Sequence, residues 1–151
     1  MASNFQGDVP GNRYFASAEV GSAASNAANA RLTEPGVIGP FPWDIRLRTM
    51  QYIPTQGNAA LSTATSSATY RRLSVYNGGT IGTVTATASR IASLNMTVSL
   101  ASFSSRAMTV STAVSLASGE MMYASHETVG GQHANGTILL GGNLAIGYEI
   151  I

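Results

Sequence analysis

His126, Glu127 and His133 come closest, by residue type and spacing, to a chemical site in this sequence. Two imidazole groups and a carboxylate are suitable zinc ligands, and a strand with a returning loop could bring them together. However, His126 and Glu127 are neighbours in a predicted strand, so their side chains point to opposite faces. We therefore expect no metal site, with His126 on a strand surface and His133 in a loop.

Catalytic chemistry has equally little support. The chain contains neither cysteine nor lysine, which excludes a thiol nucleophile, a Schiff base and a Walker-type phosphate loop. The seven carboxylates are scattered, and two histidines alone do not define a triad. We therefore expect a protein that is not an enzyme and that binds no cofactor.

The arginines offer a different kind of chemistry. Arg46 and Arg48 share one face of a predicted strand, and Arg71 and Arg72 lie near the next strand. Guanidinium groups in such clusters bind phosphates or carboxylates. Because seven acidic residues are available to eight arginines, ion pairs at a contact between subunits are the interpretation that we favour.

The overall composition favours a protein that is covered by partners. Charged residues make up 10% of the chain, against about a quarter in ordinary soluble proteins. The net charge of +1 gives no reason to expect a nucleic-acid ligand. No window approaches about 18 apolar residues, and residues 1–5 lack the pattern of a signal peptide, so we expect no membrane association.

The elements that must position these side chains are strands. Residues 91–116 contain two runs in which apolar and polar residues alternate, joined by the polar stretch 102–106. A period of two is typical of a half-buried strand. Further strands are predicted at 43–52, 70–77, 120–129 and 143–151, and glycines separate several of them. We therefore predict an all-β fold, an antiparallel β-sandwich or jelly roll over residues 43–151. Its predicted core contains Leu94, Met96, Val98, Val110, Val114, Ile146 and Tyr148.

Residues 1–42 differ from the rest of the chain. They hold four of the five prolines, together with a stretch rich in Ala, Ser and Asn. We predict an extended N-terminal arm that lies outside the sandwich and runs along neighbouring subunits, since proline limits the backbone freedom lost on docking. The residues predicted to bind partners are Phe5, Tyr14, Phe15, Phe41, Arg46 and Arg48.

Several runs give the chain a family resemblance. They are 70–77, 92–100, 113–120, 126–131 and 144–149. In texture and strand order they resemble the small β-rich structural proteins of tailed bacteriophages, which are capsid decoration (cement) proteins or the knobs of tail fibres and spikes. The resemblance implies a virion protein on the capsid surface that bridges and stabilises major capsid subunits. Proteins of this kind are often trimers, so the resemblance also implies a homo-oligomer, with a trimer as the expected form. The alternative that it leaves open is a knob that recognises the host surface.

Overall fold

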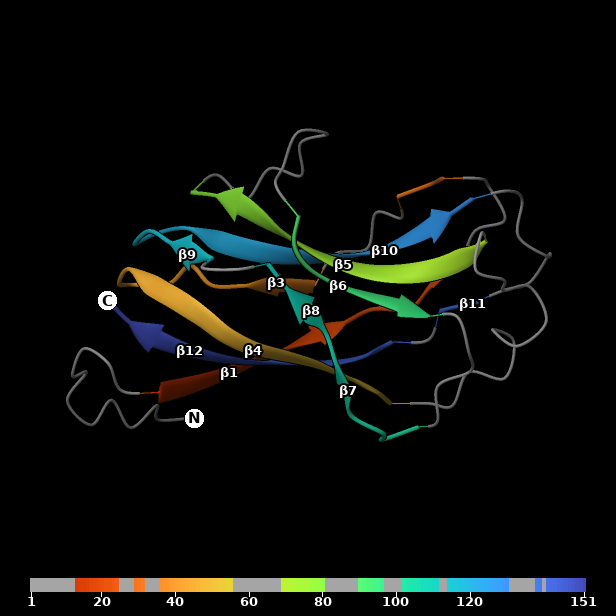
Figure 1. The fold of residues 1–151 in the computed structure, drawn as a ribbon, viewed down its shortest axis with the longest axis horizontal. Helices are drawn as coiled ribbons and strands as arrows, with labels where there is room; N and C mark the ends of the chain where they lie inside the picture. Colours follow the sequence, from red (N-terminus) through yellow and green to blue (C-terminus); the bar gives the residue numbers. More distant parts are fainter. Residues whose placement is uncertain are drawn as a thin grey trace.

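The computed structural model of the chain is a stack of two antiparallel β-sheets (Figure 1). It describes residues 13–24, 29–31, 36–55, 69–80, 90–96, 102–111, 114–130, 138–139 and 141–151. The first sheet has the order β1-β12-β4-β7, and β9 also pairs with β4. Its strands are β1 (Arg13–Val20), β12 (Gly142–Ile150), β4 (Ile45–Pro54), β7 (Arg106–Ala107) and β9 (Ser115–Leu116).

The second sheet has the order β3-β10-β5-β6-β8. Its strands are β3 (Gly36–Ile38), β10 (Met121–Val129), β5 (Tyr70–Gly79), β6 (Arg90–Met96) and β8 (Thr109–Val110). A separate small pair joins β2 (Ala23–Ala24) to β11 (Ile138–Leu139). The predicted all-β, antiparallel sandwich is confirmed, whereas its jelly-roll connectivity stays a prediction. The described residues include no helix long and apolar enough to cross a membrane.

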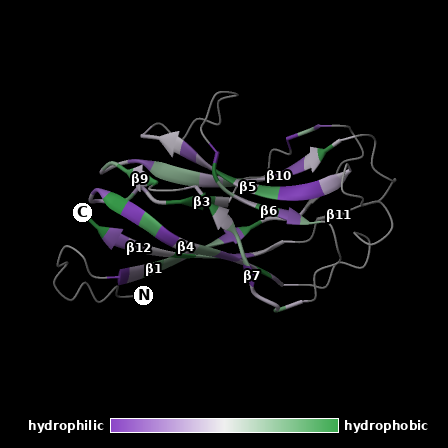
Figure 2. Cartoon of the chain, viewed as in Figure 1, coloured by the Kyte–Doolittle hydropathy of each residue, from purple (hydrophilic) through white to green (hydrophobic). Residues whose placement is uncertain are grey.

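The core lies between the two sheets and follows the predicted alternation, except at a bulge of β4 between Leu47 and Thr49, where the buried positions change from odd to even. On β4, Ile45, Leu47 and Met50 are buried while polar neighbours face outward, which gives this strand its banded colouring (Figure 2). Among the predicted core residues, Met96 and Ile146 are buried. Four others are half-buried against the core: Leu94, Val110, Val114 and Tyr148. Val98 lies outside the described residues.

The second of the two alternating runs is not one strand. It divides into β7, β8 and β9; β8 pairs with β6 in the second sheet, and β7 and β9 pair with β4 in the first. In Figure 1 this segment crosses from one layer to the other. A segment that changes sheets can form only a few backbone hydrogen bonds with the strands of each sheet, so β7, β8 and β9 are short. The buried side chain of Met108, between β7 and β8, anchors the crossing in the core.

The prediction that the sandwich begins at residue 43 is wrong. β1 pairs with β12 along its whole length, from Arg13 opposite Glu149 to Val20 opposite Gly142. β3 pairs with β10, so two segments of the predicted arm are strands of the two sheets. The physical reason is the apolar alternation of β1, whose even positions face inward and whose last residue, Val20, is fully buried. Phe5 lies outside the described residues.

Candidate functional site

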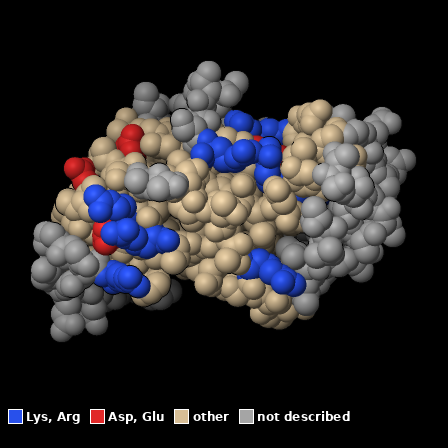
Figure 3. Space-filling view, in the orientation of Figure 1, with Lys and Arg blue, Asp and Glu red and all other residues tan. Residues whose placement is uncertain are grey.

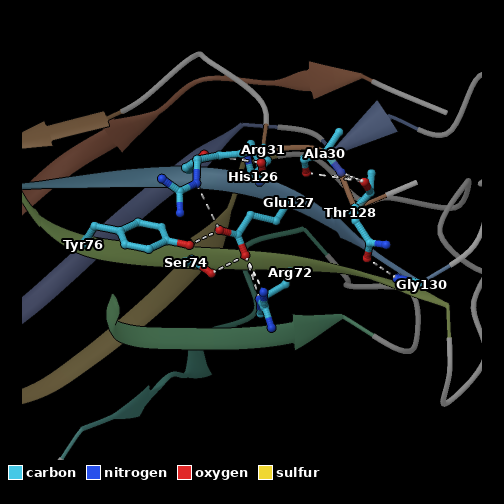
Figure 4. A network of polar contacts seen from close by, with 11 residues as sticks. Ala30, Arg31, Arg72, Ser74, Tyr76, His126, Glu127, Thr128 and Gly130 are labelled. Atoms are coloured by element: carbon cyan, nitrogen blue, oxygen red, sulfur yellow. Dashed lines mark hydrogen bonds and ion pairs between the residues drawn. The ribbon is translucent and has the colours of Figure 1, made fainter. Parts of the chain in front are cut away.

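Glu127 is the centre of the densest polar network among the described residues (Figure 4). It lies on β10 directly opposite Arg72 of β5, on the outer face of the second sheet. Arg72 donates through Nε and Nη2 to Oε2 of Glu127, at 2.8 and 2.7 Å, and Ser74 Oγ donates to the same oxygen at 2.9 Å. The other oxygen, Oε1, accepts from the Tyr76 hydroxyl and lies 3.5 Å from Arg31 Nε.

Residues 29–31 lie antiparallel beside the last residues of β10, next to this network. Thr128 N–H donates to the carbonyl oxygen of Ala30 at 2.8 Å, and Ala30 N–H donates to Thr128 Oγ1 at 2.6 Å. The Arg31 guanidinium lies 4.1 Å from the centre of the Tyr76 ring, a cation–π contact. Together these contacts bound a hollow of about 220 Å³, lined by Asn29, Ala30, Arg31, Arg72, Tyr76, Glu127, Thr128 and Val129.

The network keeps Glu127 ionised. Burial by itself would raise the pKa of Glu127, but the hydrogen bonds from Tyr76, Arg72 and Ser74 and the charge of Arg72 outweigh it, and the pKa is lowered. Burial and the neighbouring carboxylate raise the pKa of Tyr76, so its hydroxyl stays protonated and donates. A general base needs a free oxygen facing the substrate, and both oxygens of Glu127 already accept from this chain. This arrangement therefore fits an ion-pair network that holds strands and residues 29–31 together.

His126 points to the opposite side of β10, as the strand alternation predicts. The prediction that it lies on the surface is wrong, because its exposed fraction is 0%. Its Nε2 lies 2.9 Å from the carbonyl oxygen of Gly21, which makes Nε2 the protonated nitrogen. Burial is the main cause that lowers its pKa to about 4, and the charge of Arg71 adds to the effect.

His126 is therefore a neutral core histidine. His133, the third member of the predicted cluster, lies outside the described residues. No three histidine, aspartate or glutamate side chains in the described ranges come together as a set of metal ligands.

A second polar cluster lies on the outer face of the first sheet, around Glu149. Arg46 Nη1 lies 3.3 Å from Glu149 Oε1, and Arg48 Nη2 donates to the same oxygen. Arg13, on β1, is directly opposite Glu149 on β12. The hydrogen bond from Arg48 is the largest cause that lowers the pKa of Glu149, and the charges of all three arginines contribute. Blue side chains gather around a red one at the end of the molecule nearest the C-terminus (Figure 3).

Phe15 stands beside this cluster and is 80% exposed. It lies opposite Gly147, where an added Cβ would come within 3.3 Å of the Phe15 ring and 2.5 Å of Thr49 Oγ1. Glycine therefore leaves room for the aromatic ring on the sheet. On the other side of Thr49, the surface continues into a hollow of about 290 Å³, lined by Arg48, Thr49, Met50, Gln51, Ala107, Met108 and Val110.

We call Arg13, Phe15, Arg46 and Arg48 the Arg–Phe surface. It unites three of the predicted partner-binding residues, Phe15, Arg46 and Arg48, and adds Arg13. Arg13 was not predicted, because it lies within residues 1–42, which were expected to form an arm. A parity comparison of β1 with β12 would have shown that Arg13 and Phe15 share a face.

Two other predicted partner-binding residues belong to this chain's own packing. Phe41 is 5% exposed and meets the Tyr148 ring edge-on at 5.4 Å. Tyr14 is half-buried and stacks on the same ring at 5.7 Å. Their role as anchors on a neighbouring subunit stays a prediction, while within this chain both rings pack on Tyr148.

Comparisons with known proteins add no assignment: no family model matches the chain, and a search of curated proteins finds no relative.

Proposed function

We propose that the protein is a non-enzymatic structural protein of a virion, a decoration protein that binds capsid subunits and stabilises the shell. The observation that carries this proposal is the Arg–Phe surface. An exposed phenylalanine beside three arginines has the composition of a protein-binding surface, since aromatic residues and arginine are enriched at interfaces.

The state of the Glu127 network supports the same proposal. Its carboxylate is ionised and accepts from Arg72, Ser74 and Tyr76, so the most buried acid of the described chain has a structural role. A decoration protein stabilises a capsid by burying surface area against its subunits, and this requires no catalysed reaction. Each fully buried large apolar side chain contributes about 1.5–3 kcal/mol, which makes an exposed aromatic such as Phe15 a useful contact.

The proposal is tested with purified particles from which the protein has been removed. We expect stripped particles to lose their genome at a lower temperature than intact ones, and added protein to restore the original temperature. An added variant with Phe15→Ala and Arg48→Gln should restore it less completely. Particles that keep full heat resistance without the protein would contradict the decoration role.

The same preparation separates decoration from host recognition, which the resemblance leaves open. A host-binding knob should bind intact host cells as a soluble protein and compete with infection. Host binding with no effect on the heat resistance of the particles would favour the knob.

A further inference from the structure

We infer that the Arg–Phe surface and the adjoining hollow bind an acidic, extended segment of a partner protein that lies across the strands of the first sheet. This inference rests on the proposed function and gives the partner its chemistry. Charge complementarity is the first argument. Three arginines approach a single carboxylate, Glu149, which leaves a local excess of two positive charges, more than the net +1 of the whole chain.

The arginines remain accessible although they contact Glu149. The side chains of Arg46 and Arg48 are 42% and 45% exposed, and both contact the same oxygen, Oε1. A guanidinium has five donors in a planar fork that matches a carboxylate. Exposed ion pairs of this kind contribute little stability by themselves, so a partner's carboxylate can engage these side chains at little cost to the fold.

The strand arrangement gives the direction and length of the site. Phe15 on β1, Gly147 on β12 and Thr49 on β4 are neighbours across the sheet, and the hollow continues to Ala107 on β7. Neighbouring strands are about 4.8 Å apart, so the path from β1 to β7 is about 15 Å long. An extended segment of about five residues spans that distance.

The features along this path place charge and apolar contact separately. Phe15 offers a ring at one end, and Arg46 and Arg48 are residues of β4 in the middle of the path. Met108 and Val110 contribute apolar lining to the hollow at the other end. A segment with two or three carboxylates and an apolar residue near one end can contact the Phe15 ring, the arginines and the apolar lining of the hollow.

Protein fits this surface better than nucleic acid does. Binding a phosphate backbone normally engages several phosphates along a continuous basic stripe. Here Glu149 lies among the arginines and would repel each passing phosphate. Carboxylates that are spaced by side chains can avoid Glu149, whereas a uniformly charged backbone cannot.

The test uses the full chain labelled with ¹⁵N and a synthetic peptide of glutamates with one leucine near its end. We expect the peptide to shift the amide signals of Arg13, Phe15, Gly147 and Ala107, and the affinity to fall as salt is raised. Arg48→Gln and Phe15→Ala should each weaken binding about tenfold, the size of effect typical of central interface residues.

Matched variants control for charge and for exposed aromatic area. Arg90→Gln removes an exposed arginine of β6 in the other sheet, and Phe103→Ala removes a phenylalanine that is 76% exposed on a turn. Both should bind the peptide as the wild type does. Thermal unfolding of every variant shows whether a loss of binding comes from a loss of fold.

Three results would overturn the inference: control variants that weaken binding as much as Arg48→Gln, peptide-induced shifts elsewhere on the molecule, and tighter binding of a single-stranded oligonucleotide at the same surface. The experiments also distinguish a failure of the proposed decoration role from a failure of this inference. Peptide binding without attachment to particles would remove the decoration role but keep the partner chemistry. Equal attachment of the wild type, Arg48→Gln and Phe15→Ala to particles would support the decoration role. It would also show that the Arg–Phe surface is not used for attachment.

Discussion

At the scale of single residues, the two neighbours Glu127 and His126 show how one strand divides its chemistry between two faces. The carboxylate faces outward and accepts from Arg72, Ser74 and Tyr76, whereas the imidazole faces the core and contacts the Gly21 carbonyl. The sequence predicted this division from strand parity. It could not predict that both side chains are buried, because the covering residues, such as Arg31 and Gly21, are far away in the chain.

Replacement of Glu127 by glutamine should destabilise the protein by about 2 kcal/mol, because it leaves the partly buried guanidinium of Arg72 without its charged partner. The pKa of Glu127 is lowered in the folded state. Its contribution is therefore present above the unfolded pKa, near 4.3, and is lost as the pH falls through the folded pKa. Urea denaturation at pH 7 measures the loss. Glu149→Gln is the matched control on the exposed cluster and should cost much less. Equal losses for the two variants would contradict the role of the Glu127 network.

His126 should make the protein sensitive to mild acid. Its folded pKa of about 4 lies below the ordinary value of 6.5, so the unfolded chain binds more protons in between, and stability rises with pH across this window. The loss between pH 6.5 and pH 4 should reach about 3 kcal/mol, at about 1.4 kcal/mol for each unit of pKa shift. Denaturation midpoints measured across this window check it. His126→Gln should flatten the dependence, and an unchanged slope in that variant would assign the effect to another group.

At the scale of elements, the buried face of β12 and of the first half of β4 was predictable, because large apolar residues alternate there with polar or small ones. β4 changes parity at a bulge, where Gly147 is opposite Thr49 and Tyr148 is opposite Leu47, and no sequence pattern marks this shift. On β12, Leu144, Ile146 and Ile150 are all buried. β1 was missed because its inward positions include Ala16 and Ala18, whose small side chains give a weak apolar pattern. The division of the second central run into β7, β8 and β9 could not be predicted, because no sequence pattern specifies which sheet a two-residue strand joins.

The approach of β3 to β1 depends on Gly36. An added Cβ there would collide with the backbone carbonyl of Glu19 and come within 3.2 Å of the Val20 side chain. A backbone atom cannot rotate away, so Gly36→Ala should destabilise the protein by about 1–3 kcal/mol, the usual cost of overpacking. Thermal unfolding measures this change.

The control for Gly36→Ala is Gly79→Asn. Gly79 has a φ of 63° and nothing within 4 Å of an added Cβ, and asparagine tolerates this conformation better than other residues do. Gly79→Asn should therefore leave the unfolding temperature nearly unchanged. If Gly36→Ala is equally neutral, β3 can move away from β1 and the close approach is not required.

At the scale of the whole molecule, β1 completes the first sheet. It covers the edge of β12 from Gly142 to Glu149 and inserts Val20 into the core. It also carries Arg13 and Phe15, so the strand that closes the fold is the one that supplies half of the Arg–Phe surface. The proposed partner binding is therefore coupled to stability through β1, whereas an arm outside the sandwich would leave the two independent.

Deletion of residues 2–20 should therefore impair folding itself as well as attachment to a particle. Without β1, the long edge of β12 has unpaired backbone groups, and exposed edges of this kind pair with other chains. We expect a chain that unfolds at a lower temperature and forms oligomers or aggregates, as measured by thermal unfolding and light scattering. Deletion of residues 2–12 is the control, because it leaves β1 and its described pairs with β12 in place. The shorter deletion should unfold at a higher temperature than the longer one. A monomeric, fully stable product of the longer deletion would show that the sandwich closes without β1, and the coupling of fold and surface through this strand would be wrong.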